Sequence, residues 1–167
     1  NLAKRGIRGY QQVEPGSTMM LFNMENPVVG GYTPEKVALR RAIGLAYDAN
    51  VERTQIRSGG ILAHSPLMPH TSGYDPAFKS EMAEYSPARA RALLDLYGYL
   101  DRDGDGWREQ PDGSPLVLRL ASLPDQRSRS LNELWRKYLA AIGGRMVCDI
   151  ATWPDLLKKA RAGSLMM

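Results

Sequence analysis

The second half of the chain alternates between strand-like and helix-like segments, and this order constrains the fold more than any other feature. Residues 116–122 (LVLRLAS) have the composition of a strand, and residues 127–142 place their apolar side chains on one helical face. Residues 145–151 alternate as a second strand, a helix begins near Thr152, and residues 164–167 start a third strand. The sequence therefore predicts an α/β fold in which a mixed β-sheet is flanked by helices.

Helix start and stop signals divide the first half of the chain. Thr33 caps a helix that begins at Pro34, and a second short helix is expected from Asn50 to the glycine pair 59–60. Ser86 and Gly98 bound another amphipathic helix. Residues 19–22 (MMLF) form an apolar extended run, and residues 61–85, which are rich in proline, predict a long loop.

Composition narrows the class of protein. The chain has 167 residues, 43% apolar and 24% charged, which is typical of one soluble globular domain spanning 1–167. Its net charge is +4, but the basic side chains are interspersed with acidic ones, and no stacking aromatics are interleaved with them. We therefore expect no nucleic-acid partner. The single cysteine, Cys148, excludes an intrachain disulfide, and its alternation with Met146 and Ile150 predicts that it points into the core.

Residues 101–112 (DRDGDGWREQPD) match the ligand positions of a calcium-binding loop. A helical pattern precedes this loop, but Pro111 prevents an immediate exit helix, and Arg108 stands where an apolar residue normally packs. Two interpretations stay open, a structural calcium clamp and a tight turn whose side chains satisfy their own backbone groups. In the first interpretation the candidate metal ligands are Asp101, Asp103, Asp105, Trp107, Glu109 and Asp112.

No pattern indicates an enzyme. His64 and His70 lack a third metal ligand, and no nucleophile and base occur at a recognised spacing. The glycine pairs at 30–31 and 59–60 lack the context of a phosphate-binding loop. We therefore expect a non-enzyme that requires no cofactor, with structural calcium as the one open possibility.

Four segments, in order, resemble the extracellular solute-binding proteins of family 5, the dipeptide, oligopeptide and nickel receptors of ABC importers. Residues 33–60 (TPEKVALRRAIGLAYDANVERTQIRSGG) are similar to the family's RVRQAISYAID helix region, and residues 20–27 (MLFNMENP) to the strand before it. Residues 86–120 resemble the block that contains DGDG, and residues 131–163 the helix–strand unit YLKKIGIKVEI. Departures are modest, with Gly144 in place of a β-branched residue and Asn50 in place of a charged one.

The resemblance implies one lobe of a periplasmic-binding-protein type II fold. The segments 19–23 and 164–167 would be the points where the chain crosses to a second lobe of the same polypeptide, so we expect a piece of a longer protein. The implied function is the substrate-binding component of an ABC importer, which captures a peptide or similar small solute in an interlobe cleft and delivers it to a membrane permease. The implied location is the periplasm or another extracytoplasmic space.

The resemblance also suggests ligand-binding residues. Residues 121–134 (ASLPDQRSRSLNEL) are similar to the region where dipeptide receptors place an arginine that grips the peptide carboxylate, and Arg127 matches best. The alternative interpretation is an exposed arginine near a helix start. Asn23 and Met24 are expected to line the cleft, whereas Trp107 and Trp153 are not expected to be ligand platforms.

Overall fold

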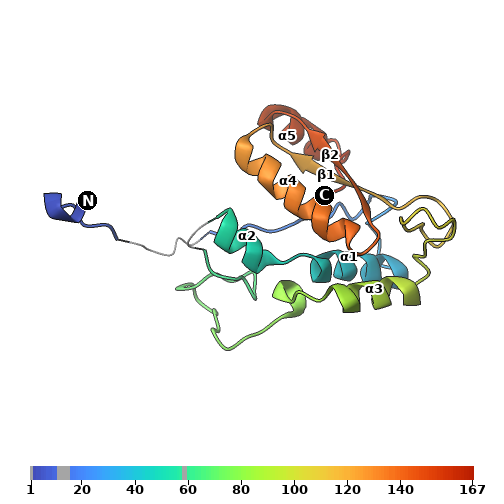
Figure 1. The fold of residues 1–167 in the computed structure, drawn as a ribbon, viewed down its shortest axis with the longest axis horizontal. Coiled ribbons are helices and arrows are strands. Elements are labelled where there is room, and N and C mark those ends of the chain that lie inside the picture. The colour runs from blue at the N-terminus through green and yellow to red at the C-terminus, as the bar shows by residue number, and fades with distance from the viewer. Residues whose placement is uncertain (1, 11–15, 58–59) are drawn as a thin grey trace.

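The computed structural model describes residues 2–10, 16–57 and 60–167, and its two-stranded sheet lies among helices (Figure 1). In this part of the chain no helix is both long enough and apolar enough to cross a bilayer. Gly59, half of the predicted stop of the second helix, lies outside the described residues. The elements in chain order are η1 (Leu2–Arg5), α1 (Pro34–Ala46), α2 (Ala49–Gln55), η2 (Glu81–Ala83), α3 (Pro87–Leu96), β1 (Val117–Ser122), α4 (Gln126–Ala140), β2 (Arg145–Ile150) and α5 (Trp153–Arg161).

The helices begin where the sequence places their caps. Pro34 opens α1 directly after Thr33, as predicted. A carboxylate caps α2, because Asp48 accepts hydrogen bonds from the backbone N–H groups of Asn50 (2.9 Å) and Val51 (3.2 Å). At α5 the predicted pair, Thr152 and Asp155, is in contact, but the Thr152 hydroxyl donates to the Asp155 carboxylate at 2.6 Å and makes no cap bond to the backbone.

The sheet is parallel, and α4 provides the crossover between its strands. In the register of β1 and β2, Leu118 faces Met146 and Leu120 faces Cys148. Figure 1 shows α4 lying across the sheet, and the described residues form no further strand. The α/β class is confirmed, with a sheet smaller than the sequence predicts.

The structure forms no strand at 19–22 or 164–167, so these two predictions are wrong, but hydrogen bonds join residues 166–167 to β1 and to Asn23. The Ala121 N–H donates to the Met167 carbonyl at 2.9 Å, and the Asn23 N–H donates to the Met166 carbonyl at 2.9 Å. Isolated bonds of this kind align segments without building the repeated ladder that defines a strand.

The core lies between α1, α3, α4 and the sheet. Its largest fully buried side chains are Tyr99, Leu39, Ile43, Leu94, Leu116, Leu118, Leu139, Ile142 and Val29. The alternating residues of β2 are predicted to point into the core, and only the first of them is buried there. Met146 is buried, but Cys148 is half-buried and Ile150 is 58% exposed. The end of β2 therefore lies at the margin of the core.

A tight loop, residues 23–31, connects the first extended segment to α1. The Gly31 N–H donates to the Met24 carbonyl at 2.8 Å, and a Cβ atom on Gly30 would lie only 2.4 Å from the same oxygen. The Arg40 guanidinium of α1 donates to the carbonyls of Val29 (2.6 Å) and Gly31 (2.9 Å). Glycine is therefore required at position 30, and the loop is fixed to α1.

Candidate functional site

The candidate ligand-facing surface is the carboxyl edge of the sheet, where β1 and β2 both end and α4 and α5 begin. In parallel α/β sheets, ligands bind in the crevice outside this edge. The Ala151 N–H donates to the Ser122 carbonyl at 3.0 Å, which closes the edge after the last ladder pair. Beneath it, the buried Asn132 amide donates to the buried Ser122 hydroxyl at 2.8 Å. This pair holds α4 against β1 and so fixes the position of the first turn of α4.

Arg127, the predicted carboxylate-binding residue, lies in that first turn and is exposed. The α4 N-cap is Asp125, whose carboxylate accepts from the Ser128 N–H and hydroxyl, both at 2.9 Å. These hydrogen bonds hold the pKa of Asp125 below its usual value, so the cap is ionised. No residue in the described part of the chain makes a hydrogen bond or ion pair with the Arg127 guanidinium.

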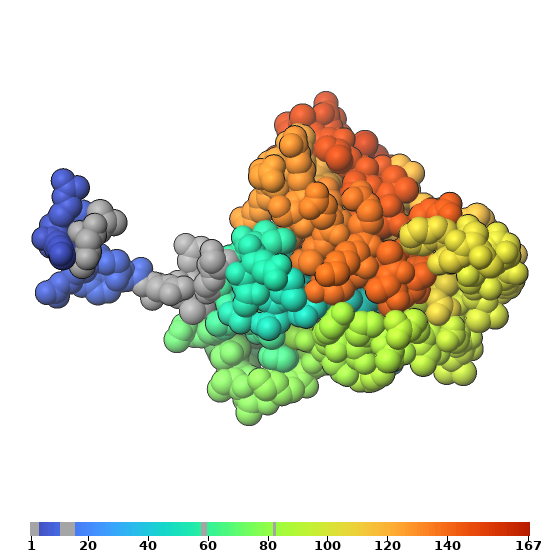
Figure 2. Space-filling model, in the orientation of Figure 1, coloured from blue at the N-terminus to red at the C-terminus, as the bar shows by residue number. Residues whose placement is uncertain are grey.

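An open groove of about 510 Å³ runs between α2 and α4 beside Arg127. Its lining includes two arginines and consists of Gln55, Ile56, Arg57, Gln126, Arg127 and Ser130. Figure 2 shows α2 (cyan) packed beside α4 (orange) at this place. Arg57 is already paired with Glu52, whereas Arg127 has no ion-pair partner in the described ranges and could bind an anion. The groove therefore offers one uncommitted guanidinium among amide and hydroxyl groups.

Trp153 is the residue at this edge that sequence reasoning set aside. It is the first residue of α5, directly after the β2 edge, and it is 65% exposed. An exposed indole at the end of a parallel strand is a suitable apolar surface for a ligand. The available signal was its position between a predicted strand and a predicted helix.

Asn23 and Met24, also predicted to line the cleft, are occupied by contacts within the chain. The Asn23 amide nitrogen donates to the carbonyls of Gly163 (2.9 Å) and Leu165 (2.8 Å), and its amide oxygen accepts from the Glu25 N–H (3.0 Å). Met24 is half-buried. The structure therefore brings neither residue together with Arg127 in the groove.

The acidic loop gathers four of its six predicted ligand residues. One carboxylate oxygen each from Asp101, Asp103, Asp105 and Glu109 lies within 4.8 Å of all the others. The loop also satisfies its own backbone, because Asp101 accepts from the N–H groups of Gly104 (2.8 Å) and Gly106 (3.0 Å). The donor chemistry suits calcium, and the hydrogen bonding equally suits a tight turn.

The other two predicted ligands have different partners. Asp112 accepts from the Ser114 N–H (2.9 Å) and hydroxyl (2.7 Å), and these bonds lower the pKa of its carboxyl group. The Trp107 ring lies under the Arg145 guanidinium at 5.3 Å, and Arg145 also pairs with Asp105 at 3.2 Å. A basic side chain of β2 thus already neutralises part of the loop's negative charge.

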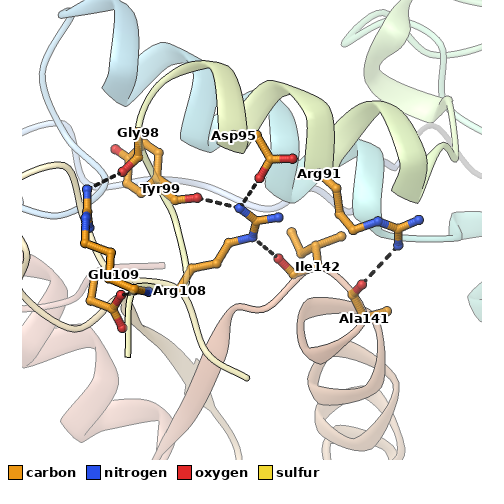
Figure 3. Close-up of polar contacts among 9 residues, drawn as sticks. Arg91, Asp95, Gly98, Tyr99, Arg108, Glu109, Ala141 and Ile142 are labelled. Carbon is orange, nitrogen blue, oxygen red and sulfur yellow. Dashed lines mark hydrogen bonds and ion pairs between the residues drawn. The ribbon is translucent and has the colours of Figure 1, made fainter. Parts of the chain in front are cut away.

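The contacts of Arg108 explain why an arginine occupies a loop position that is usually apolar (Figure 3). Its side chain is 11% exposed and donates to the Tyr99 carbonyl, the Ile142 carbonyl (2.7 Å) and the Asp95 carboxylate (2.5 Å). Gly143 packs so closely against it that a Cβ there would lie 2.9 Å from the Arg108 Cγ atom. Arg108 therefore joins the ends of α3 and α4 to the acidic loop, a role that no sequence pattern indicates.

Comparison with known proteins identifies relatives of this arrangement. The family model described as bacterial extracellular solute-binding proteins, family 5 Middle, matches residues 2–167. No curated protein sequence matches the chain.

Solved structures of similar fold include oligopeptide-binding AppA from Bacillus subtilis with a nonapeptide (TM-score 0.72, 22% identity, 83% of this chain and 27% of that one). NikA from Brucella suis with Fe(III)-EDTA has a TM-score of 0.68 and 24% identity, covering 78% and 26% of the two chains. MelB from Agrobacterium fabrum with stachyose has a TM-score of 0.68 and 19% identity, covering 87% and 24%. The chain thus spans about a quarter of the length of these proteins.

Proposed function

The chain belongs to the bacterial extracellular solute-binding proteins of family 5, and from this premise we propose that it forms one lobe of the substrate-binding component of an ABC importer. The lobe contributes one wall of a cleft, and a second lobe of the same polypeptide closes over the solute. The binding energy of the solute selects the closed state. The closed receptor then docks on a membrane permease from the periplasmic or extracytoplasmic side. The family consists of binding proteins, so we propose no catalytic activity.

The proposed ligand wall is the carboxyl edge of the sheet, and the observation that carries it is the exposed Arg127 guanidinium, which has no hydrogen-bond or ion-pair partner among the residues that the structure describes. A planar guanidinium binds a carboxylate with two parallel hydrogen bonds, which is the geometry that a peptide C-terminus requires. Trp153 provides an exposed aromatic surface at the same edge. Together these two side chains favour a solute with a carboxylate and an apolar part.

This chemistry favours peptides over neutral sugars. The similar solved structures hold a nonapeptide, an Fe(III)-EDTA chelate and stachyose, and only the first two ligands carry carboxylates. An uncommitted arginine has no charge partner on an uncharged oligosaccharide. We therefore propose a short peptide with a free C-terminus as the solute class.

Calorimetry on the receptor that contains this lobe tests the proposal. Matched peptides with a free or an amidated C-terminus should differ in Kd by about tenfold or more, because a charge-assisted bidentate pair is lost. The Arg127→Gln variant should abolish that difference, whereas Arg129→Gln, an exposed arginine of the same helix outside the groove, should preserve it. Equal affinity of the two peptides for the unmodified receptor would refute carboxylate recognition. The isolated lobe, which lacks the opposite wall, should bind either peptide weakly or undetectably.

The alternative function, a calcium-binding structural module built around residues 101–112, stays a prediction. The carboxylate cluster favours it, whereas the engagement of Asp105 by Arg145 and of Asp112 by Ser114 disfavours it. In either case the loop is far along the chain from Arg127, and calcium would serve stability instead of solute capture.

A further inference from the structure

The side chain of Asn23 connects two extended segments that lie far apart in the sequence. Its amide nitrogen donates to Gly163 and Leu165, while its backbone N–H donates to Met166 at 2.9 Å. Its amide oxygen accepts from the Glu25 N–H. Both amide hydrogens, the amide oxygen and the backbone N–H are therefore committed to the chain itself.

On one side of Asn23, the segment that it holds is packed against β1. Met166 and Met167 are 6% and 8% exposed, and the Met167 carbonyl accepts from the Ala121 N–H. The Met166 sulfur also accepts from the Arg119 N–H at 3.1 Å. This segment thus has Asn23 on one flank and β1 on the other.

On the other side of Asn23, the chain enters the tight loop that ends at Gly31. The Met24–Gly31 hydrogen bond, the crowding at Gly30 and the Arg40 bonds fix this loop to α1. A displacement of Asn23 is therefore transmitted to the helical layer instead of being absorbed by a slack loop.

We propose that Asn23 is a positioning residue that locks the two extended segments together and so sets the orientation of the lobe about its hinge. This proposal rests on the proposed function, because it takes segments 19–23 and 164–167 as the points where the chain crosses between lobes. It assigns Asn23 an action through the backbone and not through contact with the solute.

Hydrogen exchange of the chain tests the lock without any ligand. The Asn23→Asp variant keeps the acceptor for Glu25 but turns a carboxylate toward two carbonyl oxygens, and Asn23→Ala removes every side-chain bond. In both variants the Ala121 amide should exchange about tenfold faster or more, because the segment that protects it undocks. The Ala151 amide, which bonds Ser122 within the sheet edge, should keep its rate.

The matched control is Asn50→Ala, which removes an exposed asparagine whose amide oxygen accepts from Arg53 of the same helix. It should leave both amides unchanged. The lock is refuted if the Ala121 rate is unaffected in the Asn23 variants, or if Ala121 and Ala151 accelerate equally, since equal acceleration indicates general destabilisation.

Peptide titration of the receptor that contains the lobe then tests the link to closure. Asn23→Asp should weaken peptide binding about tenfold and shift the small-angle scattering profile of the bound protein toward the open form. Altered exchange with unchanged affinity would overturn the hinge role. Failure of the unmodified receptor to bind any peptide would instead overturn the proposed function while the exchange result stands.

Discussion

The rings of Tyr47 and Trp135 stack with centroids 3.8 Å apart and planes 13° apart, which joins the end of α1 to the middle of α4. Tyr138 meets the same Tyr47 ring edge-on at 5.5 Å. Trp135→Ala should lower the free energy of unfolding by about 2–3 kcal/mol, since it removes both buried area and the stack. Chemical denaturation measures this loss. Trp153→Ala, at the exposed tryptophan, should change stability by less than about 0.5 kcal/mol, and equal losses would contradict the role of the stack.

Arg108 should be among the least replaceable polar residues of the lobe. Arg108→Met removes the donors to Tyr99 and Ile142 and leaves buried carbonyls unpaired, so we expect a loss of about 2–4 kcal/mol. Arg108→Lys should recover only part of it, because one ammonium group does not reproduce the fork. Arg91→Met is the control, since Arg91 makes one exposed bond to Ala141 at 3.2 Å. Denaturation midpoints that are alike for Arg91→Met and Arg108→Met would show that the brace contributes nothing.

Tyr99 should make stability fall in strongly alkaline solution. Burial, helped by the carboxylates of Glu35 and Asp112, raises the pKa of its phenol from 10.0 to about 12. The folded state therefore holds this proton more tightly than the unfolded state, and the resulting stability, complete below pH 10, is lost as the pH rises toward about 12. Tyr99→Phe has no such proton. Its melting temperature should fall less between pH 9 and pH 11.5 than that of the unmodified chain, and parallel curves would disprove the assignment.

The acidic loop should depend on Asp101 whether or not a metal binds. Asp101→Ala removes the acceptor for two backbone N–H groups and should lower the melting temperature by about 3 °C. Asp101→Asn keeps one acceptor for Gly104, so its melting temperature should lie between those of the unmodified chain and Asp101→Ala.

Calcium itself is tested in the same assay. We expect no change in melting temperature in millimolar calcium, because Arg145 already pairs with Asp105 and the last loop position bonds Ser114. A rise that disappears in Asp101→Ala would establish the calcium clamp instead.

Gly30 and Gly44 should respond oppositely to the same substitution. Gly30→Ala forces a methyl group against the Met24 carbonyl and should cost about 2 kcal/mol or more. Gly44 lies inside α1, and nothing stands within 4 Å of a Cβ there, so Gly44→Ala should stabilise the chain by about 0.5–1 kcal/mol. Thermal melts of the two variants measure both signs, and a tolerated Gly30→Ala would show that the loop relaxes.

Local sequence signals predicted the helices well because their causes are local. First-turn prolines such as Pro34 and Pro87, and terminal glycines, act within one turn, so a linear pattern contains them. The same locality explains the errors. Residues 164–167 look like a strand by composition, but strand formation requires a ladder of partners, and the segment makes isolated bonds to Ala121, Arg119 and Asn23 in place of a ladder.

Residues that act between distant segments were harder to predict. In the sequence, Arg108 is only an unusual residue for a calcium loop. Its role becomes clear from its carbonyl partners, which follow α3 and α4. Asn23 was expected at a ligand-facing wall, but nothing in its neighbourhood reveals that its amide meets Gly163 and Leu165. Ile150 alternates correctly with Met146 but is 58% exposed, so alternation alone does not predict burial at the end of β2. Such relations depend on packing across the fold and not on spacing along it.

The crowding at Gly30 also decides where a reporter of domain movement belongs. With no room for even one added carbon atom, position 30 accepts no dye or spin label unless the loop is reshaped. Tyr32 follows the loop immediately, and its ring is 82% exposed. A cysteine introduced there for labelling would report on a rigid part of the lobe, so a change in probe-to-probe distance would measure rotation of the whole body and not local wobble.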